Sequence, residues 1–568
     1  MDNPIPALAT RSMHPPLPTF PPRPGHRTAG ALPFLVLCAV LLVAVTLGHE
    51  GRRVVQLAAL AAPPLAWLWW PVRRAGVHRL RSVLVWAWAM GFVLDGAARA
   101  YLLRAYQAAP DSSMVLEAAA NTTPRETSEY LTMYGGALLP WAALALVAGA
   151  VLAVCVRRGR RAPAGDAVPP PPQPGRRRML VAGVAGAAAI SAAAYASKPW
   201  RRLHPVAYWS DWSAKVQMVR SAMGDQQAAR ERMLAKARVL QPTIGHAGPS
   251  TVVLVITDSV NRDNMSLYGY GRPTTPLLQA QQAQLGAAFT VFRHAWSVDA
   301  STLPALHNLF RFGDPAAQDP LHLIALARAA GYKVWWMTNH DDVGIEQAHA
   351  RLADEVEMNN RTPGRSSVSL DQEVLDCVHE ALQEPDARKL LIVHLMGAHP
   401  HYSLRFPEGA NPFDDAPDAV SAAMGDSGRP AWLRRRRHEY DAAVLYQDLI
   451  VAEILKMARG IGTDDGHRAF MYLSDHGQEV GHGADWAGHS AATAAGYRIP
   501  LVVWQNRPPL LPPTDLGQRP FRADWAAWTV SHLLDIRWAG YRPERDVLHA
   551  AYRWQAPDIP VPPGAFVQ

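Results

Sequence analysis

The stretch TVVLVITDS, residues 251–259, indicates the fold of the larger part of the chain. Its continuous apolar and β-branched run, 251–257, is typical of a strand that is buried on both faces of a sheet. Helical patterns separate it from similar runs downstream. The runs are KVWWMT (333–338), KLLIVHL (389–395), AFMYLS (469–474) and IPLVVW (499–504), and the helical patterns cover 321–332, 371–383 and 438–459. This alternation predicts an α/β domain with a largely parallel sheet.

Acidic and imidazole side chains follow three of these strands. Asp258 comes directly after the first run, His399 shortly after 389–395, and Asp475-His476 directly after 469–474, with His489 further on. In open α/β sheets, chemistry collects outside the carboxyl ends of the strands. Carboxylates and imidazoles together suit Zn²⁺. One such histidine alone is more often a core or surface residue, but three converging strand ends predict a metal site.

A further segment, HAWSVDASTLPALHNLF (294–310), places hydroxyl residues before a helix-like stretch. Ser301 and Thr302 there fit a helix N-cap, with Pro304 in the first turn. They also fit a hydroxyl that a metal ionises to make it a nucleophile. The two interpretations are compatible, because a helix N-terminus also stabilises an incoming phosphate.

The N-terminal third has the composition of a membrane domain. We expect a disordered cytoplasmic tail over 1–29 and a transmembrane domain over 30–197, because its apolar runs are long enough to cross about 30 Å of hydrocarbon. The runs are 31–48, 54–71, 83–103, 135–156 and 179–196, which predicts about five helices. The second run is short and contains Pro63 and Pro64, so four spans are the alternative. Arginine asymmetry between the loops places the N-terminus in the cytoplasm and everything after about 197 outside it.

Composition sets further bounds on the protein. The 568 residues are 49% hydrophobic and 18% charged, which excludes a disordered chain, and three cysteines exclude a disulfide scaffold. The net charge of +8 comes partly from the cytoplasmic loops, so we expect no nucleic-acid partner. Residues 198–248 fit interfacial linker helices, rich in aromatic residues, or an ordinary packed linker. We then expect the α/β domain to cover 249–568, outside the cytoplasm, in a multi-pass membrane protein.

Three motifs resemble a known family, the membrane-anchored phosphoethanolamine transferases of the alkaline phosphatase superfamily. They are VLVITDSVNRDNMSLYGYGRPTTPLL (253–278), HLMGAHPHY (394–402) and SDHGQEVG (474–481), and their order and spacing agree along nearly the whole chain. The resemblance implies an alkaline-phosphatase-like domain that transfers phosphoethanolamine from phosphatidylethanolamine to an envelope acceptor. The transfer would need one or two zinc ions and pass through a phospho-threonine.

The resemblance also implies roles for individual residues. Asp258, Thr302, Asp475 and His476 would hold the catalytic zinc, with Thr302 as the nucleophile and Ser301 as the alternative. The phosphoryl group or a second zinc would be bound by His399 and His489. In the outer loop, NTTPRETSEYL (121–131) is similar to the helix that touches the lipid donor, which makes Thr122 and Glu126 candidate donor contacts.

Several departures from the family pattern leave the acceptor open among lipid A, core sugars and exported glycans. Asp258 stands in place of the usual Glu, Gln478 follows Asp-His-Gly where Glu is usual, and Ala118 replaces an Asn of the donor-side helix. Cysteine pairs beside the nucleophile are absent. The basic loop 403–437 fits either an anionic acceptor or a solvated face.

Three other functions compete with this interpretation. A phosphoglycerol transferase would use the same metal centre with another donor. A sulfatase-like hydrolase shares the fold but needs a Cys/Ser-x-Pro-x-Arg motif, which this chain lacks after Thr302. A periplasmic binding or sensor module would keep the fold without turnover.

Overall fold

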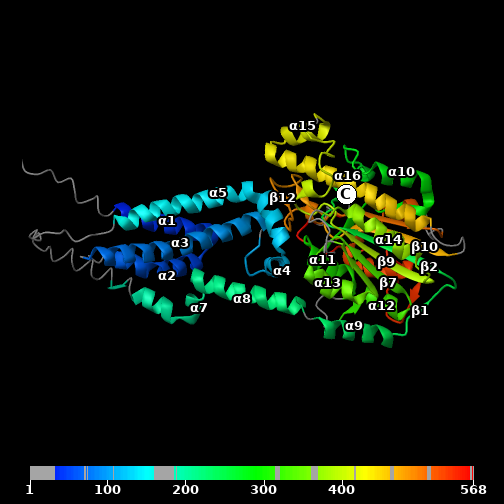
Figure 1. Ribbon diagram of the computed structural model, residues 1–568, viewed down its shortest axis with the longest axis horizontal. Helices are drawn as coiled ribbons and strands as arrows, with labels where there is room; N and C mark the ends of the chain where they lie inside the picture. The colour runs from blue at the N-terminus through cyan, green and yellow to red at the C-terminus, as the bar shows by residue number, and fades with distance from the viewer. Residues whose placement is uncertain are drawn as a thin grey trace, which may run out of the picture. The chain divides into compact units, whose positions relative to one another are not determined.

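The structure is a computed structural model, and it describes most of the chain (Figure 1). The described residues are 32–68, 72, 74–106, 108–158, 185–186, 189–224, 226–313, 320–359, 369–414, 417–460, 466–507, 513–562 and 566. The predicted tail, 1–29, lies outside them. The chain divides into two compact units, Met1–Gly96 with Leu144–His204 and Ala97–Ala143 with Pro205–Gln568. The second unit therefore includes the outer loop of the predicted membrane domain.

The first unit is helical. Its helices and helix parts are α1 (Leu32–Gly48), α2 (Arg52–Leu68), the first part of α3 (Ala75–Tyr106), the last part of α5 (Pro124–Arg157) and α7 (Lys198–Arg201). Two helical segments, Ala75–Tyr106 and Leu138–Arg157, are long and apolar enough to span a membrane, and α1 is a shorter apolar helix. The predicted fifth run, 179–196, lies partly outside the described residues. The number of spans therefore stays a prediction.

The second unit is built on a seven-stranded sheet in the order β3-β13-β10-β2-β9-β7-β8. The strands are β2 (Ser250–Thr257), β3 (Phe289–Val291), β7 (Lys333–Thr338), β8 (Glu355–Met358), β9 (Arg388–Leu395), β10 (His467–Ser474) and β13 (Leu501–Gln505). Five strands from β10 to β8 run parallel, whereas β13 is antiparallel to both of its neighbours. The predicted largely parallel α/β sheet is thus confirmed, with β13 as the strand of opposite direction.

Successive residues of the central strands face two different hydrophobic layers. Val253 and Val255 pack with one layer, whereas Val252 and Leu254 pack with the other. The first layer includes α10 (Pro276–Leu285), α14 (Val374–Gln383) and α16 (Ala431–Arg459), and the second includes α11 (Thr302–Leu309), α12 (Leu323–Ala329) and α18 (Ala526–Leu533). Burial on both faces explains why these strands are apolar throughout.

Shorter elements complete the unit. The remaining α-helices are α4 (Ser113–Asn121), α8 (Pro205–Gly224), α9 (Gln227–Val239), α13 (Val343–Ala348), α15 (Ala419–Asp426) and α17 (Pro513–Gly517). Two-stranded pairs join β1 (Thr243–Ile244) to β15 (Ile536–Arg537), β4 (Ala295–Trp296) to β14 (Phe521–Arg522), β5 (Arg311–Phe312) to β6 (Leu321–His322), and β11 (Glu479–Val480) to β12 (Ala487–Gly488). The predicted linker 198–248 thus forms mainly α7, α8 and α9, and α8 packs on α4 of the outer loop.

Candidate metal centre

Two carboxylates lie side by side, each directly after the end of one of two adjacent parallel strands. The register pairs Thr257 of β2 with Ser474 of β10, so Asp258 and Asp475 follow side by side, and both are fully buried. Ser259 adopts a left-handed conformation, with φ of 64°, and its hydroxyl donates to Asp258 Oδ1 over 2.6 Å. Its backbone N–H donates to Asp475 Oδ1 over 3.1 Å. This one residue therefore orients both carboxylates.

The four side chains expected to hold zinc come together around these carboxylates. Thr302 Oγ1 lies 3.0 Å from Asp258 Oδ2 and 3.4 Å from His476 Nε2. His476 Nε2 in turn lies 3.7 Å from Asp258 Oδ1 and 3.4 Å from Asp475 Oδ2. Ligands about 2.0–2.1 Å from a tetrahedral zinc are about 3.3–3.4 Å apart. The spacing of these atoms therefore fits a zinc ion.

The chemistry of the donor set supports the same fit. Buried Asp475 Oδ2 has no hydrogen-bond partner among the described residues. His476 Nδ1 lies 2.7 Å from the carbonyl oxygen of Gly477, a contact that favours a proton on Nδ1 and leaves the Nε2 lone pair for a metal. Burial, with the neighbouring Asp258, raises the pKa of Asp475 to about 7. A bound cation would relieve this repulsion between two buried carboxylates.

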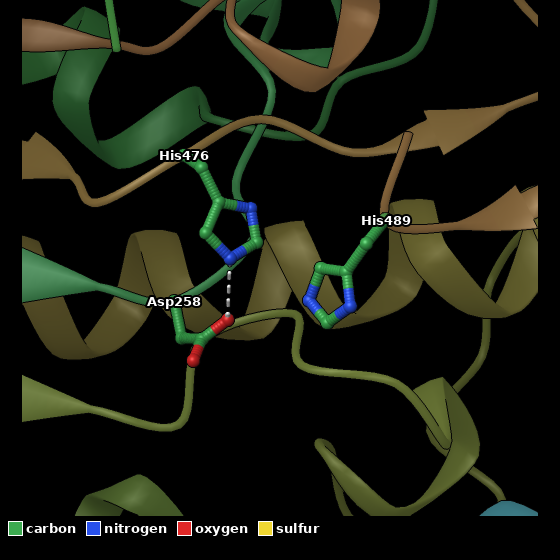
Figure 2. A group of neighbouring side chains, drawn as sticks. All are labelled: Asp258, His476 and His489. Atoms are coloured by element: carbon green, nitrogen blue, oxygen red, sulfur yellow. Dashed lines mark ion pairs between the residues drawn. The ribbon is translucent and has the colours of Figure 1, made fainter. Parts of the chain in front are cut away.

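Two further histidines border the centre. Figure 2 shows Asp258, His476 and His489 gathered together, and their ligand atoms all lie within 4.8 Å of one another. The His489 ring is 4.7 Å from that of His476 and 6.2 Å from that of His399. Burial lowers the pKa of His489 to about 3 and also lowers that of His399. His399 Nδ1 and His489 Nε2 are buried and have no partner among the described residues, so they can bind phosphoryl oxygens or a metal.

His340, which follows β7, also borders the centre and was not predicted from the sequence. Its Nε2 lies 3.9 Å from Asp258 Oδ2, its Nδ1 lies 3.1 Å from Asp342 Oδ2, and its ring stacks on His394 with centroids 4.1 Å apart. The sequence signal for this histidine is its position two residues beyond the carboxyl end of the predicted strand 333–338.

The outer-loop candidates lie in the same unit as the centre. Thr122 is exposed, and its hydroxyl donates back to Ala118 O over 2.7 Å. Glu126 accepts from the backbone of Thr123 over 2.8 Å, and burial, followed by repulsion from Asp342, raises its pKa to about 8. Glu126 is thus close enough to the residues after β7 to sense their charge.

Asn121 connects this loop to the segment after β7, which sequence reasoning also missed. Its amide donates to Asp342 Oδ1 over 2.5 Å and its oxygen accepts from Gly344 N over 2.9 Å. Ala118, where the resemblance expects an asparagine, offers no such polar group. Without a structure, no periodicity or spacing marks Asn121 as the residue that makes this contact.

The other departures also have structural consequences. The amide of Gln478 donates to Tyr402 OH over 3.1 Å, and Glu479 accepts from the backbone N–H of Gly483 at 3.0 Å. The prediction that 403–437 is a loop is wrong for its last part, because the four arginines lie in the first turns of α16 (Ala431–Arg459). Arg437 is buried there and donates to Val480 O over 2.7 Å, whereas Arg435 is exposed. The four consecutive arginines therefore do not form one solvated face.

Comparison with known proteins places this site in a family. The Sulfatase family matches residues 250–509, a range that contains Asp258, Thr302, Asp475 and His476. Residues 250–509 form a sulfatase-family domain. The sulfatase-family domain belongs to the alkaline phosphatase/sulfatase superfamily, as the sequence resemblance implied.

Relatives of the chain carry the name phosphoethanolamine transferase. It is 30% identical to phosphoethanolamine transferase EptC of Escherichia coli over 321 residues, which is 54% of each chain. It is 27% identical to phosphoethanolamine transferase CptA of Salmonella typhimurium over 349 residues, 58% of this chain and 59% of the relative. The chain thus matches little more than half the length of these relatives.

Solved structures extend the comparison. The periplasmic domain of Escherichia coli EptC, crystallised in complex with Zn, is 29% identical with a TM-score of 0.50, covering 55% of this chain and 90% of that one. The integral membrane protein lipooligosaccharide phosphoethanolamine transferase A of Neisseria meningitidis is 19% identical with a TM-score of 0.55, covering 92% and 97%. The second similarity shows that the fold is shared along most of the chain.

Proposed function

We propose that the protein is a zinc-dependent phosphoethanolamine transferase. It would take phosphoethanolamine from phosphatidylethanolamine and pass it, through a phospho-threonine, to a lipid or glycan of the bacterial envelope. The observation that carries the proposal is the Thr302 hydroxyl at the start of α11, 3.0 Å from Asp258 and 3.4 Å from His476. The names of the relatives support the reaction type.

Asp258, Thr302, Asp475 and His476 would hold the zinc. Bound there, zinc supplies Lewis acidity, which lowers the pKa of the hydroxyl and neutralises charge on the transferred group. The neutral imidazoles of His399 and His489 would bind the phosphoryl group or a second zinc. The first backbone N–H groups of α11 add a positive dipole end beside the nucleophile.

In the first step Thr302 Oγ1 forms a bond to phosphorus and the phosphorus–oxygen bond to diacylglycerol breaks. The threonine proton passes through the imidazole of His399 or His489 to the departing diacylglycerol oxygen. In the second step an acceptor oxygen attacks the phosphorus, the bond to Thr302 breaks, and the acceptor proton returns to Oγ1. Each step exchanges one phosphorus–oxygen bond for another and needs no further reactant.

One residue of the outer loop supports the choice of donor. Glu126 lies in the part of the loop that resembles the family's lipid contact. Burial, followed by the charge of Asp342, raises its pKa to about 8, and once ionised it would pair with the ammonium group of phosphatidylethanolamine. A glycerol headgroup has no such charge, which favours the phosphoethanolamine donor over a phosphoglycerol donor. We place the protein in the inner membrane as a multi-pass protein, with a cytoplasmic N-terminus and a periplasmic catalytic domain. Thr122 would contact the same headgroup.

The test uses the full chain in vesicles that contain phosphatidylethanolamine. Wild-type protein should release diacylglycerol and acquire the mass of phosphoethanolamine on the peptide that contains Thr302. Thr302→Ala should abolish both, whereas Ser301→Ala, its neighbour with no side-chain capping bond, should keep both. Normal diacylglycerol release by Thr302→Ala would refute the assignment of the nucleophile.

A further inference from the structure

One stretch of α5, a turn beyond Glu126, contacts the loop that carries His399. Glu129 forms an ion pair with Arg405, whose side chain is 2% exposed. The same guanidinium donates from Nε to the carbonyl oxygen of His399 and from Nη2 to that of Pro400, each over 3.1 Å. Arg405 thus joins the helix of the donor-side loop to the backbone of a histidine at the metal centre.

The next turn of α5 contacts the loop that carries His489. The Tyr134 hydroxyl donates to Ala487 O over 2.8 Å, and its ring stacks on Trp486 with centroids 5.4 Å apart and planes 14° apart. The indole N–H of Trp486 donates to the carbonyl oxygen of His489 over 3.1 Å. Trp486 therefore joins α5 to the backbone of the second histidine, His489.

The connections through Arg405 and Trp486 start close together on α5 and both reach histidines that border the metal centre. Glu129 and Tyr134 are separated by about 7.5 Å of helix rise. Each connection ends on the backbone carbonyl of a histidine, and the rings of these two histidines lie 6.2 Å apart. A shift of α5 in this region would therefore move both imidazoles together, whereas the ligands at the ends of β2 and β10 are held by the sheet.

We propose that residues 129–134 of α5 position His399 and His489 for phosphoryl transfer, through Arg405 and Trp486. These are positioning residues, since they touch the histidine backbones and not the reacting atoms. The inference rests on the proposed function for its kinetic consequence. It links the donor-side helix to phosphoryl binding, so that a lipid seated beside Glu126 meets imidazoles already aligned with Thr302.

The variants follow from the contacts. Glu129→Gln removes the carboxylate that holds Arg405, and Trp486→Phe keeps an aromatic ring on Tyr134 while removing the N–H that reaches His489. Asp485→Asn is the matched control, because it changes the exposed pair with Arg429 next to Trp486. Trp432→Phe controls for loss of an indole at an exposed site.

The kinetic measurement uses full-length protein in nanodiscs with phosphatidylethanolamine and follows diacylglycerol release. Glu129→Gln and Trp486→Phe should each lower kcat/KM about tenfold with zinc content unchanged, as expected for groups that orient partners of a metal site. In a His399→Ala background Glu129→Gln should cost nothing further, and in a His489→Ala background neither should Trp486→Phe. Additive losses in these double variants would overturn the proposal, as would control variants that lose as much activity.

A structural measurement separates this inference from the proposed function. Hydrogen exchange of amides 397–402 should speed up in Glu129→Gln, and that of 486–490 in Trp486→Phe, with neither change in Asp485→Asn. Unchanged exchange in both segments would refute the coupling even if the enzyme transfers phosphoethanolamine. Wild-type protein that releases no diacylglycerol would instead refute the proposed function, and the exchange result would still decide the coupling.

Discussion

Gly397→Ala should move the carboxylate of Asp258 away from the proposed zinc position. Gly397 follows β9 with φ of +58°, and a Cβ built there would lie 2.7 Å from Asp258 N and closer still to Asp258 O. Relief of the contact with Asp258 N to 3.0 Å requires a movement of 0.3 Å (3.0 − 2.7), relief of the closer contact with Asp258 O requires more, and the atoms that must move are backbone. Zinc–ligand distances tolerate about 0.2 Å. We therefore expect zinc affinity to fall about 10- to 100-fold, with diacylglycerol release falling in parallel.

The matched control for this substitution is Gly409→Ala. Gly409 also has a positive φ, of +76°, but a Cβ there meets nothing within 4 Å. Both variants carry the strain of a left-handed alanine, about 1–2 kcal/mol, so only the clash distinguishes them. Zinc affinity is measured by competition with a chelator on purified full-length protein. A Gly397→Ala protein that binds zinc as tightly as Gly409→Ala would refute the argument that this close approach places Asp258.

The outer loop, the loop after β9 and the zinc requirement can each be tested separately. Burial raises the pKa of Glu126 to about 8, so its carboxylate forms as the pH rises from 7 to 9. The KM for phosphatidylethanolamine should therefore fall over that range. Glu126→Gln should abolish this pH dependence. Asp371 accepts from the backbone N–H groups of Met396 and Gly397 over 3.0 Å each, so Asp371→Asn should cost about 3 kcal/mol, measured as a lower Tm of the full-length protein. Treatment with the chelator dipicolinate should abolish diacylglycerol release, and added zinc should restore it. Restoration by magnesium instead of zinc would contradict the assigned metal.

The strand ends were predictable because burial leaves a strong pattern in the sequence. A strand covered on both faces must be apolar throughout, so 251–257 and 469–474 stand out, and the aspartate directly after each of them stands out against the apolar run. Asp258 and Asp475 were found in this way, and parallel pairing of β2 with β10 then brings them together. By contrast, the antiparallel direction of β13 leaves no mark, since a buried strand reads the same in either direction.

The contacts that orient the site were not predictable from pattern. Arg405 and Glu129 are 276 residues apart, and neither stands in a periodic or unusual context. Asn121 and Asp342 are separated by 221 residues and belong to a predicted membrane loop and to a segment after a strand. Pairing between such residues depends on how the outer loop packs on the α/β domain. That packing is a property of surfaces, which one sequence does not encode in any local signal.

The charges buried at the candidate centre favour a bound cation in the folded protein. Asp258 and Asp475 are fully buried side by side, and the ion pairs to them in the described part of the chain come from histidines alone. Burial raises the pKa of Asp258, but the surrounding imidazoles, His399 and His476 first, lower it well below its usual range. At the same time burial and Asp258 raise the pKa of Asp475. Two buried carboxylates need compensating positive charge. Burial lowers the pKa of His340, but its hydrogen bond to Asp342 and the charge of Asp258 raise that pKa to about 9, so His340 supplies one positive charge beside Asp258. A divalent cation among Thr302, His476 and these two carboxylates would meet that requirement, so we expect metal removal to lower the stability of this region as well as its activity.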